Sequence, residues 1–344
     1  MVMQDGGTVD VRPGADPGRA APEHRGAYRV TALCLGLYAG TLFAWTVYGI
    51  ARGDGDLDDF LEGLFNPGAA PGAQVLGPYE WSFTVVFAVV AALALAQRRV
   101  ARSAALLSAA LLLAVSLREG VGLLSGPYRA QYGHDPLGGW ALATRGLGLV
   151  VALVVPAVLL PAVEGRRRAP GTAAWAGPDA RRDRSARICG VLFLLMGLAR
   201  LSWTVRDLTT GGTDVAHYLR GVVDGSLLGT PDLSASTEFT TVGSVLTLLV
   251  LGTLALRARR DVRGALLVFA AVELYLTVRT VVWLTVTDFF NRSLETTEGA
   301  LSMATTAYGL AAMTSVVVLA TGRGFGPYGG IRTEGFRTAR AGRP

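Results

Sequence analysis

The residues with the clearest chemical potential are charges that interrupt long apolar runs. At 1.5 Å per residue, Glu273 lies about 15 Å along an expected helix from Arg263, near the middle of its run. Arg200 lies about 20 Å from Arg187 on another run. A charge at the centre of a membrane helix costs about 2.5 to 3.5 kcal/mol on insertion scales, so it needs a partner. We therefore predict that Glu273 and Arg200 pair in the interior, directly or through a water molecule or a ligand.

Further charges in these runs outline an arginine-rich pocket. Its expected ligand-binding residues are Arg145, Arg200, Arg206, Arg118, Arg279, Glu80 and Glu238. Guanidinium groups bind phosphate and carboxylate groups, so such a pocket suits a small molecule with an anionic or polar head and an apolar tail. Alternatively, Glu273, Glu119 or Glu298 acts as a general acid, and the sequence leaves open whether the chain is an enzyme.

Arg118 and Arg279 occupy matching positions near the outer ends of two runs. Each lies about 24 Å from an arginine at the inner end of its own run. One interpretation is that both side chains snorkel to lipid headgroups. The other is that Arg118 pairs with Glu80 and Arg279 with Glu238, since these glutamates begin the preceding runs at the same end.

The composition excludes several cofactors and sites. All 32 residues counted as Lys+Arg are arginine, so the chain has no lysine for a Schiff base, a P-loop or a general base. His24, His134 and His217 lie outside the apolar runs, which argues against haem ligation within the membrane. Cys34 and Cys189 lie inside apolar runs, as small core residues do, and not in a disulfide or thiolate metal pattern. We therefore expect no cofactor and no metal site.

The hydropathy pattern predicts the fold class. With 51% hydrophobic residues and mean hydropathy +0.41, the 344-residue chain is too apolar for an ordinary soluble domain. A run of roughly 20 apolar residues crosses a hydrocarbon layer of about 30 Å. Such runs occur at 29–50, 81–97, 103–124, 139–163, 188–208, 238–256, 264–287 and 297–320. We predict an all-α polytopic protein with eight transmembrane helices, surrounded by membrane lipids and without a nucleic-acid partner.

The arginines predict the orientation, because positively charged loops remain on the cytoplasmic side. They gather on one side, at Arg98, Arg99, Arg102, Arg166 to Arg168, Arg181, Arg182, Arg184, Arg187, Arg257, Arg259, Arg260, Arg263 and in the C-terminal tail. The opposite loops, 51–79 and 209–237, are acidic. Both termini are therefore expected in the cytoplasm. A lysine-free chain rich in Ala, Gly, Val and Leu is typical of a high-GC bacterial genome, which indicates a bacterial cytoplasmic membrane.

An internal repeat organises the chain. A shift of 158 residues superposes Arg29 on Arg187, Trp45-Thr46-Val47 on Trp203-Thr204-Val205, and Glu80 on Glu238, and a shift of 161 superposes Arg98-Arg99 on Arg259-Arg260 and Arg118 on Arg279. Two tandem four-helix units of like orientation are expected to pack about a pseudo-twofold axis. The predicted divisions are a disordered tail at 1–27, a first unit at 28–163, a linker at 164–187, a second unit at 188–320 and a basic tail at 321–344.

The most informative charges occur in one copy only. Arg200 stands where the first copy has Leu42, and Glu273 where it has Leu112. Conversely, Arg145 has no charged counterpart in the second copy. A duplicated scaffold cannot account for these differences, so we assign them to the function.

Two local features complete the prediction. Weakly amphipathic segments at 57–65 and 215–223, within the outer loops, are expected to form short helices at the membrane surface, with an irregular loop as the alternative. The small-residue pair Gly36 and Gly40 predicts close helix packing.

A family resemblance rests on local features of each unit. They are the arginine-led first helix (Arg29-Val-Thr-Ala-Leu-Cys-Leu-Gly and Arg187-Ile-Cys-Gly-Val-Leu-Phe), the long outer loop, the Arg98-Arg99 turn, and Ser116-Leu117-Arg118 followed by Gly133-His134-Asp135-Pro136-Leu137. In these features the chain resembles the four-helix membrane modules of the DoxX-like and HTTM (vitamin K-dependent carboxylase-like) families, the first unit well and the second in outline. The carboxylase's lysine base is absent, so carboxylation is not implied. The layout is also similar to haem A synthase, but the required histidine ligands are missing.

These observations favour a membrane protein that binds an amphiphilic or anionic small molecule, of the lipid, isoprenoid or quinone type, in an outward-opening charged pocket. The first alternative is an intramembrane enzyme that protonates an isoprenoid-type substrate with a glutamate, as terpene cyclases do. The second is a transporter of an anionic solute. The sequence does not determine the oligomeric state.

Overall fold

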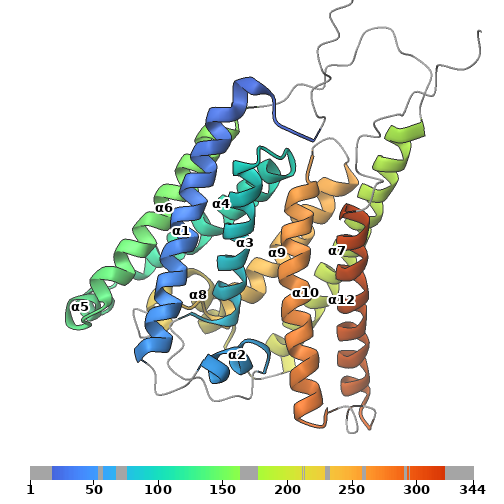
Figure 1. Ribbon diagram of the computed structural model, residues 1–344. Coiled ribbons are helices and arrows are strands. Elements are labelled where there is room, and N and C mark those ends of the chain that lie inside the picture. Colours follow the sequence, from blue (N-terminus) through green and yellow to red (C-terminus); the bar gives the residue numbers. More distant parts are fainter. Residues whose placement is uncertain are drawn as a thin grey trace, which may run out of the picture.

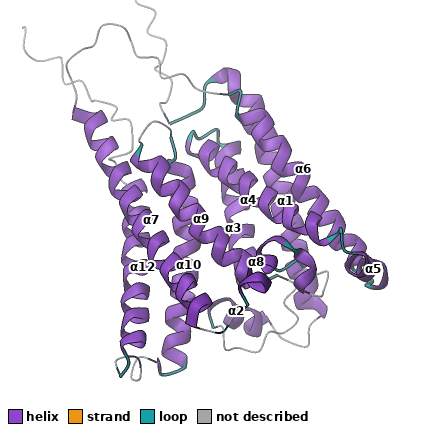
Figure 2. Cartoon of the chain, turned by 180° about the vertical axis from the view of Figure 1, so that it is seen from behind, coloured by secondary structure: helices purple, strands orange, loops and turns teal. Residues whose placement is uncertain are grey.

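A computed structural model describes residues 18–52, 57–66, 76–162, 177–210, 212, 214–228, 233–257, 261–289, 293 and 295–321, with the backbone alone at 177–183. Figure 2 shows that this part of the chain is built from helices. Its residues form no strand beyond one isolated bridge between Arg19 and Arg98. The all-α prediction is therefore confirmed.

Eight helices of the described residues are long and apolar enough to cross a membrane, as predicted. They are α1 (Arg25–Arg52), α3 (Pro78–Leu95), α4 (Val100–Gly122), α6 (Gly138–Leu159), α7 (Gly177–Thr210), α9 (Thr237–Leu256), α10 (Arg263–Val286) and α12 (Thr297–Thr321).

Three shorter helices lie towards the same end of the bundle, the lower end in Figure 1. The predicted amphipathic segments form α2 (Leu57–Phe65) and α8 (Val215–Val223). The Asp214 side chain caps α8 by accepting a hydrogen bond from the Ala216 amide. A third helix, α5 (Gly126–His134), is not in the sequence prediction because its residues lack apolar periodicity.

The chain is more ordered at two boundaries than predicted. Residues 18–24 belong to the expected disordered tail, yet the Ala20 amide donates to the Gln97 carbonyl and the Arg99 amide donates to the Gly18 carbonyl. These bonds hold the segment against the turn between α3 and α4. Likewise, α7 begins at Gly177, inside the expected linker. The predicted tail beyond residue 321 lies outside the described residues.

The spanning helices form two groups (Figure 1): α1, α3, α4 and α6 in one, and α7, α9, α10 and α12 in the other. Within the first, α1 packs on α3 and α6, and α4 packs on α6. Within the second, α7 packs on α9 and α12, and α10 packs on α12. The groups meet mainly where α10 packs against α4 and α3.

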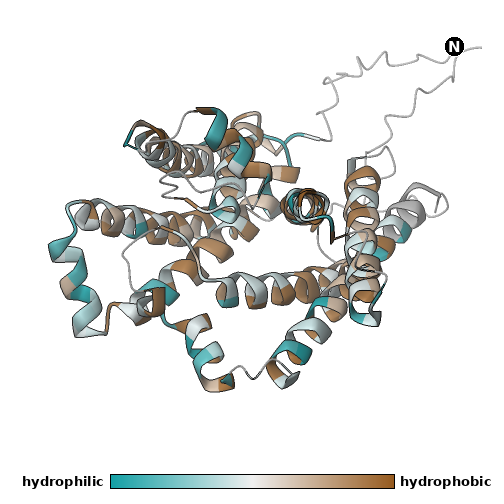
Figure 3. Cartoon of the chain, turned by 90° about the horizontal axis from the view of Figure 1, so that it is seen from below, coloured by the Kyte–Doolittle hydropathy of each residue, from teal (hydrophilic) through white to brown (hydrophobic). Residues whose placement is uncertain are grey.

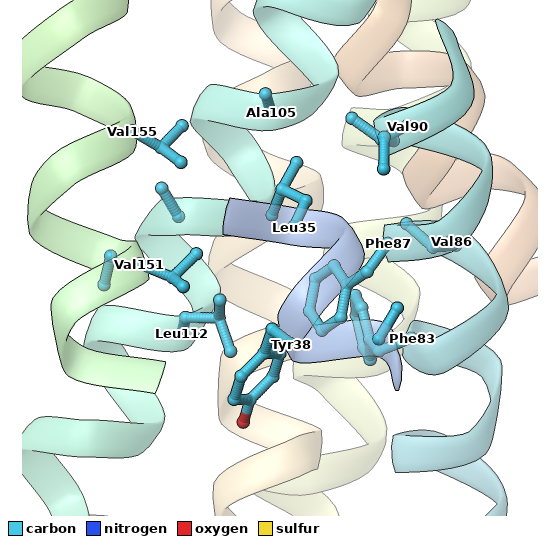
Figure 4. Packing of buried hydrophobic residues seen from close by; sticks show 14 of the residues in the cluster. Leu35, Tyr38, Phe83, Val86, Phe87, Val90, Ala105, Leu112, Val151 and Val155 are labelled. Carbon is cyan, nitrogen blue, oxygen red and sulfur yellow. The ribbon is translucent and has the colours of Figure 1, made fainter. Parts of the chain in front are cut away.

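Each group has its own buried hydrophobic cluster. Figure 4 shows the first, in which Tyr38 lies beside Phe83, Phe87 and Leu112. The outer faces of the long helices also expose large apolar side chains, such as Leu33, Val85, Leu153, Leu246 and Val318. Figure 3 shows hydrophobic residues along the helices. Exposed apolar surface of this extent is typical of helices that face lipid.

The prediction for Gly36 and Gly40 is wrong. A methyl group at Gly36 would lie 3.8 Å from Ala91 Cβ, an ordinary contact, and at Gly40 it would meet no atom within 4 Å. Close packing occurs instead between α7 and α9, where a methyl group at Gly190 would lie 2.8 Å from the Gly252 carbonyl oxygen. The spacing of small residues does not tell which helix face is packed.

Candidate functional site

The predicted pair of Glu273 and Arg200 is present in the bundle. Arg200 Nη2 lies 2.5 Å from Glu273 Oε2, and Glu273 is 0% exposed. Ser244 of α9 completes the group: it receives a hydrogen bond from Arg200 Nη1 (2.5 Å) and donates one to Glu273 Oε1 (2.6 Å). No pattern in the sequence predicts a role for Ser244. A buried carboxylate with a cation and a hydroxyl donor is stable in place, whereas the loss of one partner leaves an uncompensated charge.

Neither Arg118 nor Arg279 pairs with Glu80 or Glu238, so that interpretation is wrong, and Arg118 is too buried to snorkel. Arg118 is 5% exposed, lies over the Phe239 ring at 5.4 Å and donates to the Gly221 carbonyl of α8 at 3.4 Å. Arg279 donates to the Gly63 carbonyl of α2 at 3.3 Å. Each arginine thus reaches a short helix associated with the other group.

Glu119 lies in a buried polar cluster with two tyrosines of α5. The Tyr132 hydroxyl donates to Glu119 Oε1 at 2.5 Å, and the Tyr128 hydroxyl lies 3.5 Å from that of Tyr132. Burial raises the pKa of Tyr128 to about 12, and burial together with the bond to Glu119 raises the pKa of Tyr132. Both phenols therefore stay protonated at neutral pH and act as donors.

Arg206 and Glu298 form an exposed pair between α7 and α12, with Arg206 Nη1 2.6 Å from Glu298 Oε1. The Arg206 guanidinium also lies 5.2 Å from the centre of the Trp203 ring. This pair borders an open polar crevice of about 410 Å³. The sequence singled out both residues without predicting their contact.

A second feature is an apolar cavity of about 370 Å³ between the first group and α9. Its walls come from α1, α3, α4 and α6 on one side and from α9 with the segment before it on the other. Most lining residues are aliphatic or aromatic, among them Leu42, Phe83, Leu112, Phe239 and Leu246. The charged lining residues are Glu80 and Arg145, accompanied by the phenols of Tyr38 and Tyr79.

The structure therefore separates the predicted ligand-binding residues. Glu80 and Arg145 line the cavity. The remaining ones, Arg200, Arg206, Arg118, Arg279 and Glu238, do not line it. Neither do the glutamates considered as general acids, Glu273, Glu119 and Glu298, which contact Arg200, Tyr132 and Arg206 respectively.

The described residues contain no group of three His, Cys, Asp or Glu side chains that could hold a metal ion. Cys34 and Cys189 are free thiols.

Comparison with protein-family models, curated proteins and solved structures finds no match for the chain. The resemblance to the DoxX-like and HTTM modules thus stays a prediction, and the physical features of the site carry the functional argument.

Proposed function

We propose that this protein is an integral membrane protein that binds an amphiphilic small molecule in the apolar cavity, with the polar head of the ligand beside Glu80 and Arg145. The observation that carries the proposal is the cavity itself. Its volume of about 370 Å³ is typical of small-molecule sites, which are mostly apolar with a few convergent polar groups. Here the polar groups lie at one end and the apolar lining at the other.

The cavity has the dimensions of a lipid tail. Along α9 it extends from Phe239 to Leu251, about 18 Å at 1.5 Å per residue. This is more than half of a hydrocarbon layer of about 30 Å. Because Glu80 begins α3 at the end that carries α2, α5 and α8, the head lies near that membrane surface.

Access from the membrane is supported by exposed residues at the cavity edge. Ala110 and Ala114 of α4 and Leu246 and Val250 of α9 are exposed, and all of them line the cavity. Small side chains on α4 leave a passage between the two helices. A ligand dissolved in the bilayer can enter there without passing through water.

We propose the orientation that the sequence predicts, in a bacterial cytoplasmic membrane with α2, α5 and α8 outside. A cysteine placed at Asp58 or Ala216 should react with an impermeant thiol reagent in intact cells. Labelling only after lysis would reverse the topology, and the cavity would then open towards the cytoplasmic leaflet.

We also propose that the two groups of helices are tandem copies related by a pseudo-twofold axis. Equivalent contacts support this. Arg102 Nε donates to the Leu159 carbonyl at 3.2 Å, and 161 residues later Arg263 Nε donates to the Ala320 carbonyl at 2.7 Å. Trp45 donates to Thr144, and Trp203 donates to Thr305.

Reciprocal contacts between the groups support the same axis. Arg118 donates to Gly221, and its counterpart Arg279 donates to Gly63, the counterpart of Gly221. The Gly264 amide also donates to Ser103 Oγ at 3.0 Å, although the 161-residue shift superposes these two residues. Equivalent positions touch each other only close to a twofold axis.

Native mass spectrometry of the full chain, purified in detergent and incubated with a lipid extract of the producing cells, tests the binding proposal. Gly243 lines the cavity, and a methyl group there would meet no atom within 4 Å, so Gly243→Leu fills the cavity without a backbone clash. Gly40→Leu is the matched control, because Gly40 is an exposed helical glycine with equally open surroundings.

We expect a bound ligand in the parent and in Gly40→Leu, and its loss in Gly243→Leu. No retained ligand in the parent, or equal retention in the two variants, would overturn the proposal.

A further inference from the structure

The charges around the cavity indicate what kind of head it accepts, an inference that rests on the proposed function. We infer that the ligand carries an electrically neutral head, such as an alcohol or a carbonyl group, and not a phosphate, a carboxylate or an amine. This narrows the sequence expectation of an anionic ligand in an arginine-rich pocket.

The first step is the balance of charge in the lining. One carboxylate and one guanidinium face the cavity, those of Glu80 and Arg145. Both interact electrostatically with the Tyr38 phenol, so they belong to the same end of the cavity. An anionic head beside Arg145 therefore also lies near the negative charge of Glu80, and a cationic head beside Glu80 meets Arg145.

The two charges are held in place by the fold. Glu80 Oε1 accepts a hydrogen bond from the Ala235 amide at 2.8 Å, which ties α3 to the segment before α9. Arg145 is 8% exposed, and Gly148, one turn further along α6, packs on Tyr38, whose hydroxyl would lie 3.2 Å from a methyl group there. The Glu80 carboxylate therefore cannot readily move away to admit an anionic head.

The second step is the net charge of the buried residues that surround the cavity. The buried and half-buried guanidinium groups in the outer part of the spanning helices are those of Arg118, Arg145, Arg200, Arg206 and Arg279. The carboxylates there are those of Glu80, Glu119, Glu238 and Glu273, together with that of Glu298, the exposed partner of Arg206. The two signs are equal in number. Arg200 is neutralised by Glu273, and the Phe239 ring, which lines the cavity, lies beneath Arg118. No excess positive charge remains to compensate a desolvated anion, which is costly in a low-dielectric site.

The third step is the presence of uncharged hydrogen-bonding groups. The Tyr38 and Tyr79 hydroxyls face the polar end of the cavity, and neither has a hydrogen-bond partner within the described part of the chain. In Figure 4 the Tyr38 hydroxyl points away from the hydrophobic cluster. A phenol both donates and accepts, so the pair matches a hydroxyl or carbonyl head.

Three probes that share one tail and differ in head charge test the inference: farnesol, farnesyl phosphate and farnesylamine. Their dissociation constants for the purified full-length chain are measured by native mass spectrometry, with Gly243→Leu as the background for non-specific adducts. We expect farnesol to bind the parent about tenfold more tightly than either charged probe, a difference of about 1.4 kcal/mol.

The two outcomes that contradict the account are distinguishable. Tightest binding of farnesyl phosphate or farnesylamine would overturn the neutral head while leaving amphiphile binding intact. Equal adducts of all three probes on the parent and on Gly243→Leu would overturn the proposed function itself.

Two variants that each remove one charge sharpen the result. Glu80→Gln keeps an acceptor for the Ala235 amide but leaves Arg145 unbalanced, so farnesyl phosphate should become the preferred probe. Arg145→Gln should favour farnesylamine by the same reasoning. If the ranking of the probes is unchanged in both variants, neither charge contacts the head and the inference fails.

Discussion

The two halves of the bundle differ most at corresponding depths near the middle of the membrane. In the second half, Arg200 and Glu273 form a buried ion pair with Ser244. At the positions that the repeat superposes on them, the first half has Leu42 and Leu112, which line the apolar cavity. One half therefore has charges in its interior where the other has an apolar cavity. Under the proposed function, the ion pair stabilises the fold and the cavity binds the ligand.

The largest expected effect comes from making the second half resemble the first. Glu273→Leu leaves Arg200 without its carboxylate, and the loss of one partner of a buried pair costs about 3 to 5 kcal/mol. Because Arg200 is 26% exposed, we expect a loss of about 3 kcal/mol in the free energy of unfolding. Equilibrium unfolding in mixed detergent micelles measures this free energy.

The double variant Arg200→Leu with Glu273→Leu is the decisive control. Replacement of both charges by apolar residues should restore most of the stability lost in Glu273→Leu. A double variant as unstable as the single one would show that the second half needs its charges for more than mutual compensation.

A smaller effect is expected where the halves exchange contacts. Arg118→Gln removes a charged donor from the Gly221 carbonyl, and such a bond contributes about 1.5 to 3 kcal/mol. Arg279→Gln removes the equivalent bond to Gly63, but Arg279 is less buried, so its loss should be smaller. The same unfolding assay compares the free energy of unfolding of the two variants. A larger loss for Arg279→Gln would contradict the geometry of these contacts.

The smallest effect is a dependence on pH that arises from Tyr128 of α5 in the first half. The folded pKa of Tyr128 is about 12, above the ordinary value of 10. Above pH 10 the unfolded chain loses the Tyr128 proton while the folded chain keeps it, so the free energy of unfolding should fall between pH 10 and 12. Tyr128→Phe should show a shallower fall. An unchanged slope in this variant would contradict the burial of the phenol.

Much of the fold was predictable, because the length of a span follows directly from the cost of placing polar groups in lipid. The amphipathic helices α2 and α8 were predictable from the same pattern. The pairing of Glu273 with Arg200 was predictable too, since two costly charges at similar depth have few other partners.

The remaining contacts depend on how the helices pack against one another. The depth of a residue along its own helix does not specify this packing. Ser244 is one of many hydroxyls in the spans, and only the packing of α9 against α10 places it between the two charges. The contacts of Arg118 and Arg279 with the opposite group need the relative position of the two halves. The cavity likewise exists only after α9 is placed beside α3 and α4. The sequence prediction therefore assigned to one pocket both the residues that line the cavity and charged residues that lie outside it.

The most direct test of the central claim is to map where an amphiphile sits in the folded protein. A farnesol analogue that carries a photoreactive diazirine near its tail end is bound to the full chain, irradiated and located by peptide mass spectrometry. Ligand in the cavity predicts labelling on its inner walls, at residues such as Leu107 and Leu251, which disappears in Gly243→Leu and persists in Gly40→Leu. Labelling confined to lipid-facing residues such as Leu33 and Leu153, equal in both variants, would contradict it.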